Sequence, residues 1–307
     1  MRAAVIDLGT NTVRLLVAEL HPHAPWTTVH AEQTVTRLGE GVRATDALGE
    51  APMTRTAAAV ADYVARARAL GASRVKIVGT SAVREAKNGR VFAERLARAT
   101  GQHVEIISGD DEARLTLRGL TRGLTLAGRM IAFDIGGGST EYVLAEDARL
   151  VEAVSLKLGV VPLAERFPFP ERLDATRYAT MLREIHDQLE RELPVSIADA
   201  PIARLVGTAG TVTTLAALNL ALTTYDPERV HGHRLTHAAV DRLLARLGAL
   251  TVTERGALPC LEPGRADLII PGTAIVVATM ERLRVDALVV SEYGLREGIM
   301  EIVSESA

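Results

Sequence analysis

The strongest constraint on the fold is a short motif that occurs twice, 127 residues apart. Ile6–Thr12 reads IDLGTNT, and Phe133–Ser139 reads FDIGGGS. The same offset pairs an Ala-Glu dipeptide at 18–19 with a second one at 145–146. Each copy consists of an apolar strand, Asp-x-Gly, a small polar turn and a second strand, so the repeat indicates a duplicated domain. A chain of 307 residues is long enough for two such domains.

The chemistry of the repeated turn points to phosphate and metal binding. Asp7 and Asp134 each end a predicted strand, where a carboxylate can hold a divalent cation directly or through water. The glycines let backbone N–H groups point into a concavity that binds phosphate oxygens. Two such turns facing each other across a cleft would hold a chain of phosphates with a metal between them. The alternative, that Asp-x-Gly is only hairpin-turn chemistry, is weakened by the two copies being in register and by the three consecutive glycines of the second.

A third glycine-rich turn, Gly207–Thr211, follows a predicted strand and begins a predicted helix. Free N–H groups and the helix dipole make such a turn an anion site. It lacks the G-K-[ST] ending of a Walker loop, so the sequence does not predict that type of nucleotide site.

Glu112 is the candidate for the chemical step. In the segment 108–112 (SGDDE), Ser108 and Asp111 match a capping box, which accounts for Asp111 but does not require Glu112. A carboxylate in a first helical turn facing a cleft can take a proton from water that attacks phosphorus.

Two further charged residues have open interpretations. Arg84 follows a predicted buried strand; it is either a surface arginine paired with Glu85 or Glu94, or a cation that binds phosphate. Glu141 occupies the repeat position of Arg14, so one turn carries an acid where the other carries a cation. Such an acid could orient water, although hairpin strands often carry exposed charges.

Histidine and cysteine give weaker signals. His231, His233 and His237 could suggest a metal site, but a Tyr-Asp-Pro turn before them and Thr236 in front of a predicted helix favour ordinary loop and cap chemistry. The single cysteine, Cys260, excludes an internal disulfide and is predicted to be a small packed residue.

Short apolar runs alternate with amphipathic segments, which predicts an α/β protein throughout. The predicted strands are 3–6, 13–18, 26–35, 75–78, 104–107, 130–133, 141–144, 150–156, 202–206 and 288–290. The predicted helices are 53–70, 81–86, 92–99, one from about 108, 175–193, 211–221, 237–247, 266–282 (bent at Pro271) and 294–304.

Composition excludes several classes of protein. Net charge is −3, which argues against non-specific nucleic-acid binding. No apolar run reaches the roughly 20 residues of a membrane helix, and Asp7 interrupts the N-terminal apolar stretch, so no secretory signal is expected. We expect a cytoplasmic protein that binds neither nucleic acid nor membrane.

Taken together, the motifs resemble the exopolyphosphatase/guanosine pentaphosphate phosphohydrolase (Ppx/GppA) family, from about residue 3 to residue 300. The segments that carry the resemblance are Val5–Leu16, Thr80–Asn88, Ile107–Leu115, Phe133–Tyr142, Leu156–Gly159, Val206–Leu215, Tyr225–Thr236 and Val290–Gly298. The resemblance implies two ribonuclease-H-like domains of the actin, sugar-kinase and chaperone superfamily, with an interdomain cleft. We expect one domain at 1–121 with about 297–307, because the last helix returns to it, and the other at 122–296.

The resemblance also implies roles for individual residues. Glu112 matches the carboxylate that activates water, Glu141 matches a second acid, and Asp7 and Asp134 match the metal-side aspartates. The matched substrate-binding positions are Asn11, Thr12, Arg14, Arg84, Gly136, Gly137, Gly138, Ser139, Thr140, Gly207, Thr208, Gly210, Thr211 and Arg265. Arg14 and Arg265 stand where family members can hold a nucleotide's phosphates.

The implied activity is removal of terminal phosphate from inorganic polyphosphate, or of the 5′ γ-phosphate from guanosine pentaphosphate, with Mg²⁺ or Mn²⁺. Polyphosphate or guanosine penta- or tetraphosphate is therefore the expected partner, and a homodimer is compatible with the sequence. Two alternatives remain: a kinase of the same fold, and a guanosine tetra- or pentaphosphate sensor with little turnover.

The sequence departs from the family pattern in three ways. Thr10 and Thr12 stand where serines are often found, and Asp111 stands where many members have Glu before the catalytic Glu. Long members carry a further C-terminal helical region of roughly two hundred residues. Because this sequence ends at Ala307, we expect short chains or nucleotides rather than very long polymers as substrates.

Overall fold

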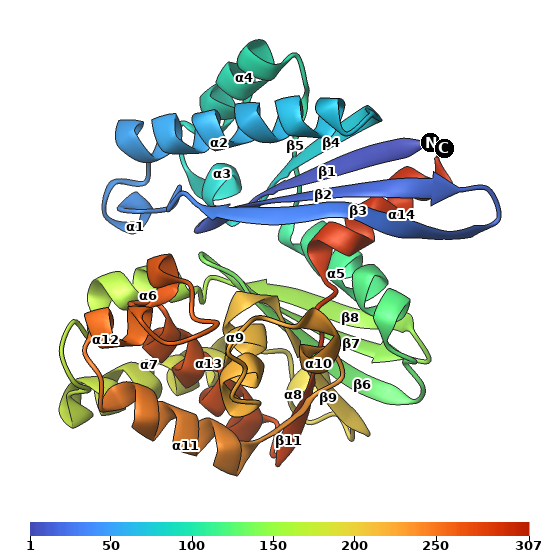
Figure 1. The fold of residues 1–307 in the computed structure, drawn as a ribbon. Helices are drawn as coiled ribbons and strands as arrows, with labels where there is room; N and C mark the ends of the chain where they lie inside the picture. Colours follow the sequence, from blue (N-terminus) through green and yellow to red (C-terminus); the bar gives the residue numbers. More distant parts are fainter. Residues whose placement is uncertain (307) are drawn as a thin grey trace. The chain divides into compact units, whose positions relative to one another are not determined.

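A computed structural model describes residues 1–306 of the chain. Contacts divide it into two compact units, which we call unit 1 (Met1–Arg122 with Gly294–Ala307) and unit 2 (Gly123–Tyr293). The chain therefore leaves unit 1 at the end of helix α5 (Gly109–Gly123) and returns to it at α14 (Leu295–Glu305), the last helix (Figure 1). The boundaries predicted from the sequence are 121/122 and about 296/297.

Unit 1 contains a five-stranded sheet in the order β3-β2-β1-β4-β5 (Figure 1). β1, β2 and β3 form an antiparallel meander, and β1 pairs in parallel with β4, which pairs in parallel with β5. Its strands are β1 (Arg2–Leu8), β2 (Thr12–His21), β3 (Ala24–Val35), β4 (Ala72–Gly79) and β5 (Val104–Ile106). Its helices are α1 (Val42–Thr45), α2 (Glu50–Ala69), α3 (Ser81–Glu85), α4 (Gly89–Thr100), α5 (Gly109–Gly123) and α14 (Leu295–Glu305).

Helices cover both faces of this sheet. Along β1, Ala4 and Ile6 belong to the core under α2 and α4, whereas Ala3 and Val5 belong to the core under α14. This alternation follows from the two-residue period of a strand and explains why β1 is apolar nearly throughout. Asp7 has the same parity as Val5, so its carboxylate lies on the α14 face of the sheet.

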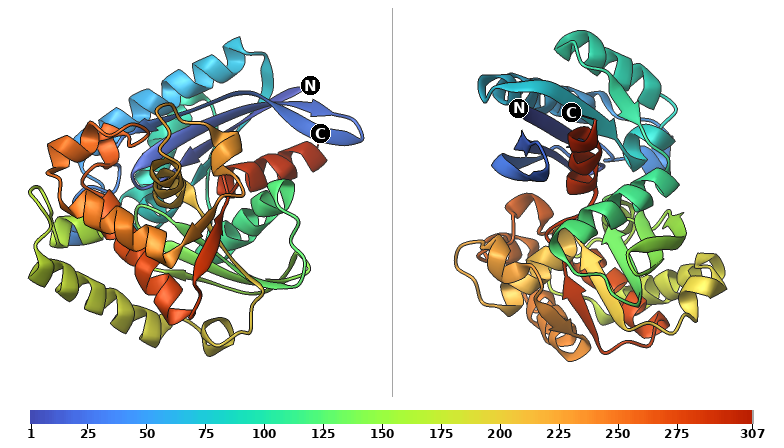
Figure 2. Two further views of the ribbon diagram at one scale, coloured as in Figure 1. Left: turned by 60° about the horizontal axis from the view of Figure 1, so that its bottom comes forward. Right: turned by 90° about the vertical axis from the view of Figure 1, so that its right-hand side faces the viewer.

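Two glycines allow α5 and α14 to cross at close range within unit 1 (Figure 2). A Cβ on Gly119 would lie 1.9 Å from the carbonyl oxygen of Gly294, and a Cβ on Gly298 would lie 1.8 Å from that of Leu115. No larger residue fits this backbone contact. The crossing fixes the first turn of α14 beside α5, the helix that carries Glu112.

Unit 2 repeats this topology. Its sheet has the order β10-β11-β9-β6-β7-β8, with β6, β7 and β8 antiparallel and β6 parallel to β9. β6 (Arg129–Ile135) matches β1 at the 127-residue offset of the sequence repeat. The other strands are β7 (Thr140–Glu146), β8 (Arg149–Leu156), β9 (Arg204–Thr208), β10 (Arg234–Thr236) and β11 (Ala287–Val290). The predicted fold class, two ribonuclease-H-like domains, is confirmed.

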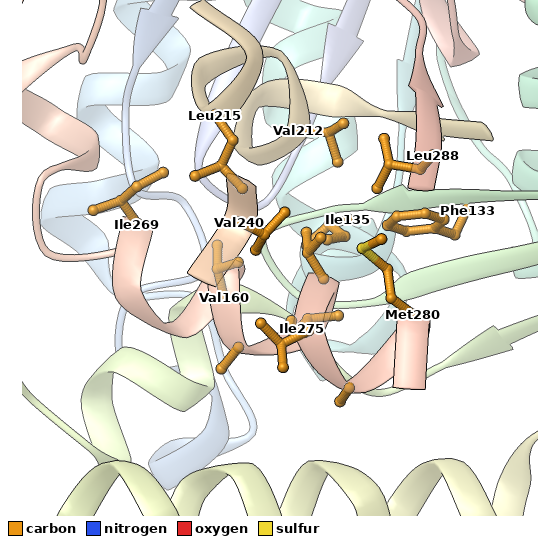
Figure 3. Close-up of a cluster of buried hydrophobic side chains, with 14 of the residues drawn as sticks. Phe133, Ile135, Val160, Val212, Leu215, Val240, Ile269, Ile275, Met280 and Leu288 are labelled. Atoms are coloured by element: carbon orange, nitrogen blue, oxygen red, sulfur yellow. The ribbon is translucent and has the colours of Figure 1, made fainter. Parts of the chain in front are cut away.

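The helices of unit 2 are α6 (Val160–Arg166), α7 (Ala175–Glu192), α8 (Val195–Ala198), α9 (Ala209–Asn219), α10 (Pro227–Val230), α11 (His237–Gly248), α12 (Val252–Gly256) and α13 (Ile269–Arg282). A large core lies between one sheet face and these helices. Phe133 and Ile135 of β6 meet Val212 of α9 and Ile275 of α13 in that core (Figure 3). None of the helices in residues 1–306 is long and apolar enough to span a membrane.

Several details of the sequence prediction differ from the structure. The long apolar helix begins at Ile269, not at residue 266, after a short 3₁₀ turn (Pro263–Arg265). Pro271 is therefore the third helical residue, where the backbone N–H has no intrahelical partner to lose, so it does not interrupt the helix. The strand predicted at 202–206 is β9, which begins at Arg204, and the short strand β10 lies in a segment predicted to be a loop.

Candidate active site

The two copies of the repeat have the same turn geometry. The Gly9 N–H donates to Thr12 O (3.2 Å) in unit 1, and the Gly136 N–H donates to Ser139 O (2.9 Å) in unit 2. A Cβ on either glycine would lie 2.8 or 3.0 Å from that same oxygen. Each turn therefore requires glycine, and the sequence repeat reflects a repeated backbone shape.

Asp7 is a buried carboxylate with one oxygen engaged. Its Oδ2 accepts from Arg14 Nη1 at 3.1 Å, and its side chain is 2% exposed. Oδ1 is buried and has no hydrogen-bond partner among the described residues. Burial raises the pKa of the Asp7 carboxyl, and Arg14 only partly opposes this effect. A buried carboxylate oxygen of this kind suits a hard divalent cation or its water.

Sequence reasoning missed the pair Arg296–Glu297 in the first turn of α14. Both charges act on Asp7. Glu297 Oε1 accepts from Arg296 Nε and Nη2 (2.9 and 2.7 Å), and Oε2 accepts from the Gly294 N–H. The only sequence signal is an Arg-Glu dipeptide nearly 290 residues after Asp7, and no local pattern links this dipeptide to Asp7.

The hydroxyls and the amide of the first turn have separate tasks. Thr10 Oγ1 accepts from the Ala82 N–H (3.2 Å), which ties the turn to α3. Asn11 donates from Nδ2 to Thr12 Oγ1 (3.3 Å), while its buried Oδ1 has no partner among the described residues. Asn11 and Thr12 thus remain predicted substrate contacts, whereas Thr10 has a structural role.

Arg84 contacts the predicted catalytic acid directly. Its Nη1 donates to Glu112 Oε2 at 2.9 Å and to the Ile107 carbonyl at 3.1 Å. Its distance to Glu85 is longer, 3.8 Å, and Glu94 is paired with Arg98. The surface pairing considered for Arg84 is therefore not its main contact.

The neighbouring acid has the structural role that the capping pattern predicts. Ser108 Oγ accepts from the Asp111 N–H (3.1 Å) and donates to the Asp111 carboxylate (2.6 Å). Asp111 is exposed, but Glu112 is only 8% exposed although it carries a charge. Among the three acids of this first turn, burial singles out Glu112.

In unit 2 the triple-glycine loop is held from one side by α6. Val160 N donates to Gly136 O (3.3 Å), and Val161 N donates to Gly137 O (2.9 Å). Because the C=O and N–H of a peptide unit point in opposite directions, these contacts turn the N–H side of the loop away from α6. The adjacent Thr140 hydroxyl donates to Leu158 O. Its hydroxyl hydrogen is thereby used within the protein.

Gly159→Ala is expected to displace this loop. A Cβ on Gly159 would lie 2.3 Å from Gly137 O and 2.4 Å from Gly138 Cα, so backbone must move. We expect kcat/KM for phosphate release to fall by about 10- to 100-fold, because misplacement by about an ångström costs this much. Gly256→Ala is the matched control, since its nearest new contact is 3.7 Å away. Equal activity of the two folded variants, measured by phosphate release, would contradict this role for α6.

Glu141 is fully buried, not an exposed hairpin charge. It is 1% exposed, accepts from Ser155 Oγ at 2.7 Å, and lies opposite Asp134 in the β6–β7 register. The equivalent pair in unit 1 is Asp7 opposite Arg14. The structure therefore places two acids together in unit 2 where unit 1 has an acid and a cation.

The turn Gly207–Thr211 is enclosed by two segments distant in sequence. Arg265 packs on it so closely that a Cβ on Gly210 would lie 1.8 Å from Arg265 Nη1. Thr208 Oγ1 donates to the carbonyls of Ser291 and Tyr293 (3.0 and 3.1 Å). The predicted contacts Gly207, Thr208, Gly210, Thr211 and Arg265 thus form one cluster.

A second repeat also went unnoticed in the sequence. Val78–Thr80 and Val206–Thr208 both read VGT and both connect a central strand to a helix. The duplication therefore extends to β4–α3 and β9–α9.

The histidines and the cysteine have the ordinary roles favoured by the sequence. His231 contacts the Gly123 carbonyl, His233 contacts Asn219, and His237 contacts Asp241. Cys260 is partly buried, and burial raises the pKa of its thiol. Within residues 1–306, no group of three or more His, Cys, Asp or Glu side chains is arranged to hold a metal ion.

The predicted residues thus gather within each unit. Unit 1 contains Asp7, Asn11, Thr12, Arg14, Arg84 and Glu112. Unit 2 contains Asp134, Gly136, Gly137, Gly138, Ser139, Thr140, Glu141 and the Gly207–Thr211 cluster. The duplicated ribonuclease-H-like units place the chain in the actin-like fold class, and its glycine turns and buried carboxylates are groups that suit phosphate and metal ions.

Comparison with known proteins gives the family. The Ppx/GppA phosphatase family matches residues 16–305, and the chain belongs to it. Exopolyphosphatase 2 of Mycobacterium tuberculosis is 38% identical over 97% of both chains. Guanosine-5′-triphosphate,3′-diphosphate pyrophosphatase of Vibrio parahaemolyticus is 29% identical, over 98% of this chain and 59% of its own. A Ppx/GppA family structure from Aquifex aeolicus superposes with a TM-score of 0.83 and 32% identity, covering 100% of this chain and 99% of that one. The protein is a hydrolase of this family.

Proposed function

We propose that the chain releases terminal phosphate from inorganic polyphosphate or from guanosine pentaphosphate in a reaction that depends on a divalent cation. The observation that carries the proposal is the contact between Glu112 and Arg84. This contact brings together the buried carboxylate of Glu112, which is a candidate base, and the guanidinium of Arg84, which is suited to binding phosphate. The names of the relatives support the substrate class.

In the proposed mechanism, Glu112 orients a water molecule and accepts its proton as the water attacks the terminal phosphorus in line. Arg84 stabilises the equatorial oxygens in the loose transition state. The backbone N–H groups of Gly136–Ser139 are the phosphate-binding donors proposed for unit 2. The bond from phosphorus to the bridging oxygen breaks, and the shortened substrate leaves with that oxygen. No covalent enzyme intermediate is required.

A divalent cation fits the residues present. Asp7 would hold it through the buried Oδ1, which has no partner among the described residues. Asp134 stays the metal-side aspartate predicted for unit 2. When bound, Mg²⁺ would offset the negative charge of the phosphates. The arginines near Asp7 then supply the remaining positive charge.

The test is a comparison of kcat/KM for long polyphosphate, short polyphosphate and guanosine pentaphosphate in Mg²⁺ and in Mn²⁺. Phosphate release without an acceptor supports the proposal. Release only when ADP or a sugar is added would instead support a kinase, and tight guanosine tetraphosphate binding without any release would support a sensor. Cytoplasmic location and a homodimer stay predictions.

Asp7→Asn is expected to separate metal binding from folding. The amide removes one charge, so we expect activity at low millimolar Mg²⁺ to fall by about 100-fold or more. Mg²⁺ should raise the thermal unfolding midpoint of the wild type and not that of Asp7→Asn, because a ligand stabilises only a fold that binds it. Asp62→Asn, an exposed acid on α2, is the control. An unchanged Mg²⁺ response in Asp7→Asn would remove Asp7 from this role.

A further inference from the structure

Arg296 is a charged residue of unit 1 that has no named task in the mechanism above. It lies in the first turn of α14, and its Nε and Nη2 donate to Glu297 Oε1 at 2.9 and 2.7 Å. The other carboxylate oxygen of Glu297, Oε2, accepts from the Gly294 N–H at 2.9 Å. Because Glu297 is only 4% exposed, one buried carboxylate fixes both the guanidinium and the start of the helix.

The guanidinium of Arg296 keeps a second edge of donors. Glu297 uses the edge formed by Nε and Nη2, which leaves the edge formed by Nη1 and Nη2. At this second edge, the only hydrogen bond within residues 1–306 is a long one, 3.5 Å, from Nη1 to the Leu15 carbonyl. The side chain is 21% exposed, so it is not sealed in the core. An arginine edge with two donors fits two oxygens of a phosphate.

The first turn of α14 lies at the end of the sheet that carries the proposed chemistry. Arg296 contacts the carbonyl of Leu15, one position along β2 from the partner of Asp7. β1, β4 and β5 are parallel, so their carboxyl ends share one edge of the sheet of unit 1. Asp7 lies at the end of β1, and the segments after β4 and β5 lead to Arg84 and Glu112.

Two arginines and two carboxylates form a charge cluster at this edge. The charges of Arg14, Arg296 and Glu297 all act on Asp7, and the two positive and two negative charges cancel. A divalent cation at Asp7 would leave the cluster with two excess positive charges, which suits a phosphate group of about two negative charges. Arg296 weakens a site for a cation alone, because like charges repel, but it strengthens a site for a cation together with phosphate.

We propose that Arg296 is a phosphate-binding residue: Glu297 holds its guanidinium beside Asp7, and Nη1 and Nη2 bind two oxygens of a substrate phosphate. An ion pair whose carboxylate is buried contributes little net stability, so the pair is better explained by the orientation it gives the guanidinium. The inference rests on the proposed function and deepens it, because it adds to unit 1 a phosphate contact that the repeated turn does not supply.

The first measurement is the dissociation constant for tripolyphosphate and for GTP, by calorimetry with Mg²⁺, in a Glu112→Gln background in which turnover is slow. We expect Arg296→Gln to raise both constants by about tenfold, as for the loss of hydrogen bonds between charged groups. Arg296→Lys keeps the charge but not the edge of two donors, so it should recover only part of the affinity. The control is Arg98→Gln, an exposed arginine of α4 on the other face of the sheet.

A second measurement separates phosphate binding from a structural role. Mg²⁺ alone should raise the unfolding midpoint of Arg296→Gln at least as much as that of the wild type, because the substitution removes a positive charge beside Asp7. A substitution that merely disturbed the start of α14 would weaken Mg²⁺ and tripolyphosphate binding together. If Arg296→Gln does not fold, the double variant Arg296→Gln/Glu297→Gln is measured in the same way, since it leaves no unpaired buried carboxylate.

Unchanged dissociation constants in Arg296→Gln, or parallel losses of Mg²⁺ and tripolyphosphate binding, would overturn the proposal. A rise confined to GTP would also overturn it, because the proposed contact is with phosphate and not with the nucleoside. Phosphate release by the wild type is assayed separately. Tripolyphosphate binding that depends on Arg296, without any release, would contradict the proposed function and leave this inference standing.

Discussion

Glu112→Gln is expected to lower kcat for phosphate release by about 100-fold or more while the protein remains folded. Glutamine keeps the shape of the side chain and can still contact Arg84, which donates to Glu112 Oε2 at 2.9 Å. It cannot accept a proton from the attacking water, so only the function of the base is removed. Initial rates at saturating substrate, with circular dichroism to check the fold, measure the effect.

Asp111→Asn is the matched control for this substitution. It changes a carboxylate to an amide one residue away in the same helical turn. The Asp111 side chain is exposed, and its carboxylate accepts a hydrogen bond from Ser108 Oγ. We expect its kcat to stay within about threefold of wild type, since loss of a surface cap interaction costs stability more than rate. Equal losses in both variants, or near wild-type turnover in Glu112→Gln, would remove Glu112 from the role of base.

The fold was predictable because the domain duplication is visible as a repeat of short sequence motifs. β1 and β6 lie exactly at the 127-residue offset, and the register that sets Asp7 opposite Arg14 also sets Asp134 opposite Glu141. Strand periodicity and glycine turns act over a few residues, so they are readable without tertiary contacts. The start of α13 was missed because residues 266–268 form a turn between the 3₁₀ helix and α13, and the sequence pattern does not distinguish such a turn from the first turn of a helix.

The candidate site was only partly predictable, and the reason is distance along the chain. Residues next to a repeated turn, such as Asp7, could be selected from the motif itself. Arg296 and Glu297 act on Asp7 because α14 packs against the face of β1 that carries Asp7. The capping pattern likewise left Glu112 undecided, and it is tertiary burial together with Arg84 that distinguishes it from its neighbour.

Unit 2 contains a structural arginine that has no part in the proposed chemistry. Arg255 is 0% exposed and has the second-largest fully buried side chain in the described chain. Its Nε, Nη1 and Nη2 donate to the carbonyls of Leu247, Phe169 and Glu171 at 2.8, 2.7 and 3.1 Å. One guanidinium thereby joins the end of α11 to the segment that precedes α7. Burial lowers the pKa of this guanidinium, because a charge without a carboxylate partner is costly to desolvate.

Arg255→Met is expected to destabilise unit 2 by about 4 kcal/mol, since it leaves three carbonyl groups without their donor and each costs about 1–3 kcal/mol. This corresponds to a fall in the unfolding midpoint of roughly 8–16 °C for a unit of this size. Differential scanning calorimetry measures it. Arg246→Met, which alters an exposed arginine on α11, should change stability by less than about 0.5 kcal/mol.

Arg255→Lys tests whether geometry or charge stabilises this part of unit 2. Lysine keeps the positive charge but concentrates its donors on one atom, so it cannot reach three carbonyls that lie in different directions. We expect it to recover less than half of the stability lost in Arg255→Met. Full recovery would mean that charge alone stabilises the segment, whereas partial recovery assigns the stability to the fork of donors that arginine provides.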